Sequence, residues 1–212
     1  MLPRIASLII GYLFGIIQTA YIYGKMNGID IREHGSGNAG TTNALRVLGK
    51  KAGLIVFAAD FLKCFVCIFL VKFIFKNSAG EILPLVALYG ATGCILGHNF
   101  PVHLNFRGGK GIACTAGMLA AFDVRIGVIA LVTFLTIVVV TRYVSLGSIV
   151  IVTEFALFTI IFGQLGFYGM SQNSLIEMYG LAVFLAAMAI YRHRANIVRL
   201  LNGTENKVFA KK

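Results

Sequence analysis

Long apolar segments separated by short polar ones recur along the whole chain and constrain its fold more than any other feature. Seven such segments lie at about residues 4–24, 53–75, 82–98, 111–122, 125–141, 146–165 and 175–191. Most approach the roughly 20 apolar residues that an α-helix needs to cross a bilayer. They lack the strict alternation of transmembrane β-strands. We therefore predict an all-α, polytopic integral membrane protein built as a seven-transmembrane helical bundle.

The fourth segment, 111–122, is short for a full crossing and rich in Gly and Ala. Small side chains let helices approach closely, so we expect this segment inside the bundle. If the fourth and fifth segments formed one hairpin that fails to cross, the count would fall to five or six. Asp123 and Arg125 lie between them and favour a turn at a surface. The length of 212 residues suits one compact bundle, so we predict a single domain over residues 1–212.

The basic residues are distributed unevenly between the two sides that seven crossings would create. Of the nineteen Lys and Arg residues, fourteen fall on one side: Lys25, Arg32, Arg46, Lys50, Lys51, Arg107, Lys110, Arg142, Arg192, Arg194, Arg199, Lys207, Lys211 and Lys212. Lys and Arg collect in the cytoplasmic loops of membrane proteins. This bias predicts a cytoplasmic C-terminus and an N-terminus outside. It also accounts for the net charge of +11 without a nucleic-acid partner. No signal-peptide cleavage site follows the first apolar segment, which we interpret as a span.

Two features inside the predicted spans indicate packing rather than chemistry. Cys64 and Cys67 form a C-x-x-C pattern, but their context, FLKCFVCIFL, is an apolar helix interior. Free cysteines in such a setting behave as small hydrophobic side chains. Asp60 and Lys63 have the spacing of a pair on one helix face, and we expect a structural ion pair. Because no acidic cluster is evident, we predict no metal site.

Four polar clusters fall on the predicted cytoplasmic side, and the first is HGSGNAGTTNALR at 34–46. Glycines among short polar side chains beside an arginine suit a phosphate group. Thr42 or Asn43 could cap a helix that starts near Ala44, with Arg46 one turn into it. An anion at that helix N-terminus would meet free N–H groups. The alternative is a flexible loop that ends in an ordinary helix cap.

The second cluster is GHNFPVHLNFRGGKG at 97–111. Its glycines would let backbone N–H groups approach phosphate oxygens, while Arg107 and Lys110 supply charge. It is not a Walker A loop, because Leu104 stands where the first glycine would be needed and Gly111 follows Lys110. Two alternatives remain: His98 could be an ordinary histidine at a helix end, and the two cations could anchor lipid headgroups.

The third and fourth clusters are weaker on their own. TRYVSLGS at 141–148 places Arg142 at the mouth of the sixth predicted span and Ser145 at its N-terminal end. In the segment 191–207, His193 and Asn196 share a helical face, and Gly203 is predicted to stop the helix. The alternative for this segment is a basic helix that lies on anionic lipid. Since all four clusters fall on one side, we predict one composite site.

These clusters carry a family resemblance. SGNAGTTNALR (36–46), GHNFPVHLNFRGGKG (97–111), RYVSLGS (142–148) and HRANIVRLLNGTE (193–205) resemble the bacterial acyl-phosphate:glycerol-3-phosphate acyltransferases, the PlsY family. The resemblance implies a seven-span enzyme of the inner membrane with its site facing the cytoplasm. It implies transfer of a fatty acyl group from acyl phosphate to the 1-hydroxyl of glycerol 3-phosphate, which yields lysophosphatidic acid and phosphate for phospholipid synthesis. We expect a monomer surrounded by membrane lipid, without a cofactor.

The same resemblance implies the site residues. The expected catalytic residues are Ser36, Arg46, Lys110, Ser145, Asn196 and His193. The expected substrate-binding residues are Asn38, Thr42, Asn43, His98, Asn99, Arg107, Gly108, Gly109 and Arg142. Acyl phosphate is already activated, so the enzyme needs mainly positioning and charge stabilisation. In the family a substrate phosphate is the favoured proton acceptor, and the alternative is His98 or His193 as general base.

Other function classes fit the sequence less well. The H-x4-D arrangement of soluble-type glycerolipid acyltransferases and the G-x-S-x-G elbow of α/β-hydrolases are absent. A small membrane transporter for phosphorylated metabolites would share the apolar segments and the basic side. Transporters often contain internal repeats and helices broken at the membrane midplane, and we find no convincing repeat. We therefore favour the enzyme over the transporter.

Overall fold

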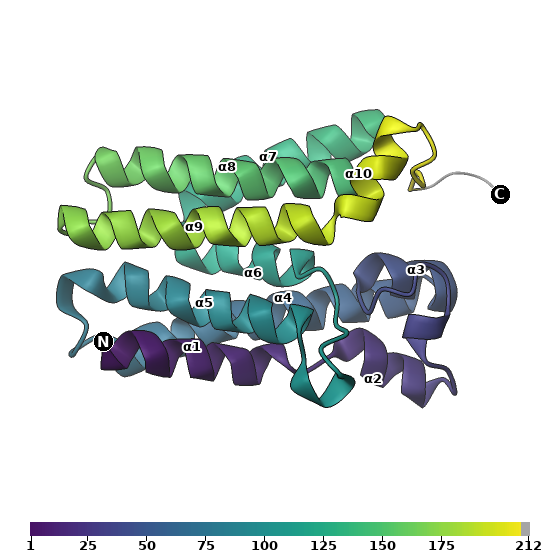
Figure 1. Cartoon of the computed structure of the whole chain (residues 1–212), viewed down its shortest axis with the longest axis horizontal. Coiled ribbons are helices and arrows are strands. Elements are labelled where there is room, and N and C mark those ends of the chain that lie inside the picture. Colours follow the sequence, from purple (N-terminus) through teal and green to yellow (C-terminus); the bar gives the residue numbers. More distant parts are fainter. Residues whose placement is uncertain (209–212) are drawn as a thin grey trace. The chain divides into compact units, whose positions relative to one another are not determined.

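The computed structural model describes residues 1–208, which form helices and no strand (Figure 1). The chain divides into two compact units, Met1–Phe122 and Asp123–Lys212, hereafter the N-terminal and C-terminal units. Among the described residues, six helical stretches are long and apolar enough to cross a membrane: Leu2–Met26, Lys50–Phe75, Gly80–Leu104, Val124–Thr141, Val144–Gln164 and Gln172–Arg192. The prediction of an all-α chain with several apolar spans is confirmed.

The N-terminal unit is built around three helices that pack along one another. Helix α5 contacts both α1 and α4, and α4 also contacts α6. Shorter helices and turns connect them. In chain order the elements are α1 (Leu2–Gly15), α2 (Thr19–Met26), η1 (Ile31–Glu33), α3 (Thr41–Leu48), α4 (Lys50–Phe75), η2 (Gly80–Ile82), α5 (Leu83–Asn99), η3 (Val102–Leu104) and α6 (Ile112–Phe122).

Glycines bring the backbones of α1 and α5 into direct contact. A Cβ on Gly11 would overlap the carbonyl oxygen of Gly90, and one on Gly93 would overlap the carbonyl oxygen of Leu8. In a bilayer, where lipid tails are as apolar as the side chains, close backbone approach is a main source of helix association. These glycines therefore hold α1 beside α5, as Figure 1 shows.

The first apolar segment, predicted as one span at about 4–24, contains two helices separated by a break at residues 16–18. Gln18 is buried at this break, and its side-chain amide donates hydrogen bonds to the carbonyl oxygens of Gly15 (3.2 Å), Gly97 (3.4 Å) and His98 (3.0 Å). A buried amide must find partners. Those partners belong partly to α5, so the break depends on a contact between distant segments.

The C-terminal unit contains α7 (Val124–Thr141), α8 (Val144–Gln164), α9 (Gln172–Arg192) and α10 (Arg194–Leu201). Helix α8 packs against both α7 and α9, and α10 contacts α8 and α9. Asp123 caps α7 by accepting the backbone N–H of Arg125 at 3.0 Å, and its carboxylate pairs with the Arg125 guanidinium at 2.6 Å. This turn confirms the predicted boundary. Gly203 follows α10 with φ +69°, as the predicted helix stop requires.

Large apolar side chains are exposed along the long helices of both units. Leu54, Phe73, Val139 and Val140 each expose more than two thirds of their surface. Soluble proteins rarely expose such surfaces continuously, whereas lipid accommodates them. The exposed apolar surface agrees with the membrane class predicted from the sequence.

Candidate functional site

Asn43 fixes the shape of the first polar loop. Its Oδ1 accepts the backbone N–H of Ser36 at 2.8 Å, and its Nδ2 donates to the carbonyl oxygens of Ile31 (3.0 Å) and His34 (2.9 Å). Helix α3 begins at Thr41 after an N-cap at Gly40, which has no side chain to cap with. The expectation that Thr42 or Asn43 caps a helix starting near Ala44 is therefore wrong. Asn43 turns away from the helix N-terminus and organises the preceding loop.

The other residues predicted in this loop lie at the surface. Ser36, Thr42 and Arg46 are exposed, and Asn38 is half-buried. Within residues 1–208 no carboxylate lies within ion-pair distance of Arg46. An arginine whose charge is not neutralised by a neighbour remains available to an anionic ligand.

The second polar loop folds back onto the end of α5. Gly108 donates its N–H to the carbonyl oxygen of Asn99 at 3.2 Å, and Gly109 donates to that of His98 at 3.1 Å. A Cβ on Gly108 would overlap the His98 carbonyl oxygen, and one on Gly109 would overlap Nε2 of the His98 ring. Both positions therefore need glycine for close approach, which explains the GG pair in the sequence.

Three predicted residues of this loop differ in exposure. Arg107 is exposed, Lys110 is half-buried and Asn99 is fully buried. Neither polar atom of the Asn99 amide has a hydrogen-bond partner among the described residues. A Cβ on Gly111 would lie 2.9 Å from Asn99 Oδ1, so this amide faces the glycine-rich stretch. Buried amides are nearly always hydrogen-bonded, and this one can serve a bound water or ligand.

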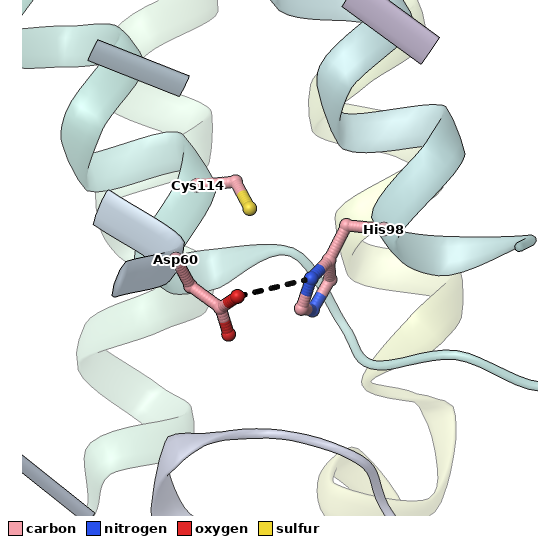
Figure 2. Close-up of side chains that lie close together, drawn as sticks. All are labelled: Asp60, His98 and Cys114. Atoms are coloured by element: carbon pink, nitrogen blue, oxygen red, sulfur yellow. Dashed lines mark ion pairs between the residues drawn. The ribbon is translucent and has the colours of Figure 1, made fainter. Parts of the chain in front are cut away.

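His98 lies in a network of charged groups inside the N-terminal unit. Its Nδ1 is 3.0 Å from Lys63 Nζ and 3.7 Å from Asp60 Oδ1. Lys63 and Asp60 form an ion pair with 2.8 Å between Nζ and Oδ1. Figure 2 shows the Asp60 carboxylate directed toward the His98 ring, with Cys114 close to both. The ion pair predicted from spacing is confirmed, and His98 is an additional member that spacing did not indicate.

Asp60, His98 and Cys114 include the donor types of a transition-metal site, and their candidate ligand atoms lie within 4.8 Å of one another. The arrangement does not fit a metal. The Lys63 ammonium already lies 2.8 Å from the carboxylate and 3.0 Å from the imidazole Nδ1. A metal cation bound to the same two groups would be repelled at close range by that ammonium. We interpret the group as a protein charge network.

In the C-terminal unit the carboxylate of Glu205 gathers two predicted site residues. Its Oε1 accepts hydrogen bonds from Ser145 Oγ at 3.0 Å and Asn196 Nδ2 at 2.7 Å. Its Oε2 accepts from Arg199 Nε at 2.7 Å. Burial alone would raise the pKa of Glu205, but the hydrogen bonds from Asn196, Arg199 and Ser145 outweigh it and lower that pKa below its ordinary value. The side chain is an anionic clamp between α8 and α10.

His193 and Arg142 occupy different environments in the same unit. His193 is buried, and its Nδ1 lies 2.8 Å from the carbonyl oxygen of Ala189. A carbonyl oxygen only accepts, so we assign the proton to Nδ1. Arg142 ends α7 in the left-handed conformation with φ +63°, and its side chain is exposed. The expectation that Ser145 lies in the first turn of its helix is confirmed by the start of α8 at Val144.

Sequence reasoning missed two groups that the structure brings to the predicted residues. Gln18 contacts His98 although 80 positions separate them, and Glu205 contacts Ser145 across 60 positions. No periodicity or spacing signals such long-range pairs. The sequence signal is limited to residue type: Gln18 is an amide in an apolar segment, and Glu205 is a carboxylate in a basic one.

Comparisons with known proteins agree with the resemblance. The model of the family described as glycerol-3-phosphate acyltransferase matches residues 5–203. A protein of that name from Thermoanaerobacter sp. (strain X514) is 43% identical over 205 residues, covering 96% of this chain and 95% of its own. Its namesake from Clostridioides difficile (strain 630) is 43% identical over 206 residues, with the same coverage.

Two solved structures are similar over almost the whole chain. Both are crystal structures of PlsY (YgiH), described as an integral membrane glycerol 3-phosphate acyltransferase. The glycerol 3-phosphate form has a TM-score of 0.83 at 35% identity and covers 97% of this chain and 95% of its own. The lysophosphatidic acid form has a TM-score of 0.79 at 35% identity and covers 96% of this chain and 94% of its own. The chain therefore belongs to the glycerol-3-phosphate acyltransferase family of integral membrane proteins.

Proposed function

We propose that this enzyme transfers a fatty acyl group from acyl phosphate to the 1-hydroxyl of glycerol 3-phosphate, releasing phosphate and lysophosphatidic acid. The chain is an acyltransferase by family, and the related PlsY structures are described by a glycerol 3-phosphate form and a lysophosphatidic acid form. The observation that carries the proposal here is the pair of glycine-rich loops whose exposed arginines, Arg46 and Arg107, have no carboxylate partner within residues 1–208.

In this proposal the N-terminal unit binds phosphate oxygens through Ser36, Arg46 and Lys110. The N–H groups of Gly108 and Gly109 donate to Asn99 and His98, contrary to the expectation that they approach phosphate oxygens. Both glycines therefore support the site by letting the loop pack against His98 beside Lys110. Charge-assisted hydrogen bonds from Arg and Lys are the strong ones for phosphate. Asn99, with its unpartnered amide, supports a bound water or ligand group next to the same loop. The supporting positions are Asn38, Thr42, Asn43, His98 and Arg107.

The C-terminal unit supplies Ser145, Asn196, His193 and Arg142 to the same reaction. Glu205 accepts hydrogen bonds from Ser145 and Asn196 and so fixes the orientation of both side chains. Arg142 is exposed and has no carboxylate partner in the described part of the chain. These features support roles in substrate positioning, where small displacements carry large rate penalties.

A substrate phosphate accepts the hydroxyl proton in the proposed mechanism. The phosphate leaving group makes the acyl donor reactive, so stabilisation of the oxyanion and of the departing phosphate is the main requirement. The geometry supports this over His98 as general base, because the Nδ1 of His98 faces the Lys63 ammonium and its Nε2 faces Gly109. His193 is the alternative general base, because a proton on its Nδ1 leaves the lone pair of its Nε2 as the acceptor.

We also propose seven crossings, with α6 as the short additional one, in the bacterial cytoplasmic membrane. Helix α6 has eleven residues and spans about 17 Å, and burial against α4 supports its place among the spans. An odd number of crossings puts the two termini on opposite sides, and the basic-residue bias assigns the C-terminus and the active site to the cytoplasmic side. A Lys207→Cys variant that reacts with an impermeant maleimide in intact cells would contradict this topology. We also expect a monomer with all 212 residues in one functional domain.

The proposed activity is tested by incubating purified protein in detergent micelles with glycerol 3-phosphate and either palmitoyl phosphate or palmitoyl-CoA. We expect lysophosphatidic acid and inorganic phosphate in equal amounts from palmitoyl phosphate and no product from palmitoyl-CoA. Turnover with palmitoyl-CoA alone would refute the proposed donor while leaving the acyltransferase class intact.

A further inference from the structure

A buried lysine lies where the first apolar segment breaks. Lys63, on α4, donates from Nζ to the carbonyl oxygens of Ile17 at 2.6 Å and Gly15 at 3.4 Å. Its ion-pair partner Asp60 accepts a hydrogen bond from Thr19 Oγ1 at 3.1 Å, at the first residue of α2. The pair therefore satisfies backbone and side-chain groups on both sides of the break between α1 and α2.

The same ammonium determines how His98 is protonated. An ammonium has three donors and no acceptor, and the short contacts of Lys63 Nζ are Ile17 O, Asp60 Oδ1 and His98 Nδ1. Nδ1 must therefore accept, which leaves the proton of a neutral imidazole on Nε2. The distance of 3.7 Å from Nδ1 to Asp60 Oδ1 is too long for a competing hydrogen bond.

The other side of the His98 ring meets the glycine-rich loop. Nε2 lies against the backbone of Gly109, where a Cβ would overlap it, and the His98 carbonyl oxygen accepts the Gly109 N–H at 3.1 Å. That carbonyl oxygen also accepts from Gln18 Nε2 at 3.0 Å. Cys114 lies in the first turn of α6, just after the loop, and its side chain is close to Asp60 and His98. The network thus touches the chain before, within and after the loop.

We propose that Asp60 and Lys63 are positioning residues, which orient the His98 ring and through it hold the backbone of Gly109 beside Lys110. The inference rests on the proposed role of this loop in binding a substrate phosphate. Neither Asp60 nor Lys63 touches substrate in this account. Their effect passes through the ring of His98. Lys63 donates to its Nδ1, Asp60 holds Lys63 in place, and Nε2 faces the loop.

Stability alone is a poor explanation for this ion pair. Replacing a buried ion pair by well-packed hydrophobic residues of similar volume is often neutral or stabilising, whereas removing one partner leaves an uncompensated buried charge. Asp60 and Lys63 expose only 1% and 6% of their side-chain surfaces. A double variant, Asp60→Asn with Lys63→Met, is therefore expected to fold while losing the ammonium that faces His98.

The first measurement is the tautomer of His98 in the unaltered protein, read from the ¹⁵N shifts of histidine-labelled protein in micelles. His98→Gln identifies the signal. We expect a neutral ring with the proton on Nε2. A proton on Nδ1 would overturn the proposal, and this result needs neither a stable variant nor a known acyl donor. In the double variant we expect the tautomer signal to shift or to broaden.

The second measurement compares kinetics and melting temperature in the double variant, with Lys72→Met as control. Lys72 is on the same helix and donates to the carbonyl oxygen of Ala121 at 2.7 Å, outside the network. We expect kcat/KM of the double variant to fall about 10- to 100-fold, mostly through KM for a phosphate substrate. We also expect a lower melting temperature, because the Ile17 carbonyl oxygen loses its donor. Wild-type kcat and KM with only a lower melting temperature would show a purely structural pair. If palmitoyl phosphate fails as donor, the proposed function fails, while the tautomer of His98 still tests this proposal and the kinetic comparison is repeated with the donor that turns over.

Discussion

Asn43 and Glu205 perform the same task in two different loops. Each is a polar side chain with several partners at once: Asn43 binds three backbone groups of the loop before α3, and Glu205 binds three side chains between α8 and α10. Both loops thereby hold candidate site residues in fixed positions. The role of Asn43 was not predicted, because an asparagine beside a helix start is an ordinary cap by sequence criteria.

The Glu205 clamp leads to a prediction about stability and pH. We expect Glu205→Gln to lower the free energy of unfolding by about 1–3 kcal/mol, since charge-assisted hydrogen bonds from three donors are weakened. Because the folded-state pKa of Glu205 is lowered, its contribution is complete above the ordinary value of 4.5 and is lost as the pH falls through the folded pKa. The difference between wild type and variant in thermal melts should therefore be constant from about pH 6 to 8 and shrink below about pH 4.5.

Glu33→Gln is the matched control for this prediction. Glu33 is exposed and belongs to the 3₁₀ turn η1, where no ion pair involves it among residues 1–208. We expect the Glu33→Gln variant to have the melting temperature of the wild type at each of these pH values. Equal effects of the two substitutions would mean that the clamp does not stabilise the fold.

At the scale of elements, the apolar pattern predicts the bounds of the helices from α4 onward in the six later segments to within a few residues. Examples are α4 at Lys50–Phe75, expected at 53–75, and α8 at Val144–Gln164, expected at 146–165. Two local features were not predicted, the break at 16–18 and the start of α3 at Thr41. Both depend on side chains, Gln18 and Asn43, whose partners are set by the folded chain rather than by local propensity.

The backbone contact between α1 and α5 predicts a large effect of a very small substitution. In Gly93→Ala the new methyl group would overlap the Leu8 carbonyl oxygen, and backbone atoms cannot move aside cheaply. We expect a loss of about 1–3 kcal/mol or more in the free energy of unfolding, measured as a lower melting temperature in detergent. Gly180→Ala in α9 is the control, since nothing lies within 4 Å of its Cβ position. A melting temperature of Gly93→Ala equal to that of Gly180→Ala would contradict the close packing of these helices.

At the scale of the whole molecule, the sequence predicted the class and the family, while the geometry added the networks inside each unit. The apolar segments and the basic bias are visible without a structure, because membrane insertion depends on composition and charge. The Lys63–His98 contact joins residues 35 positions apart on two helices, and the Ser145–Glu205 contact joins residues 60 apart. Only folding brings such groups together.

The central claim is that cations of the glycine-rich loops bind the phosphates of the substrates. The most direct test is initial-rate kinetics of Arg46→Ala and Lys110→Ala with palmitoyl phosphate and glycerol 3-phosphate, beside Lys51→Ala, an exposed lysine at the start of α4. We predict that kcat/KM falls about 10- to 100-fold in the first two variants, as expected for the loss of a charge-assisted hydrogen bond, and stays at the wild-type value in the third. Equal rates in all three variants would contradict the claim.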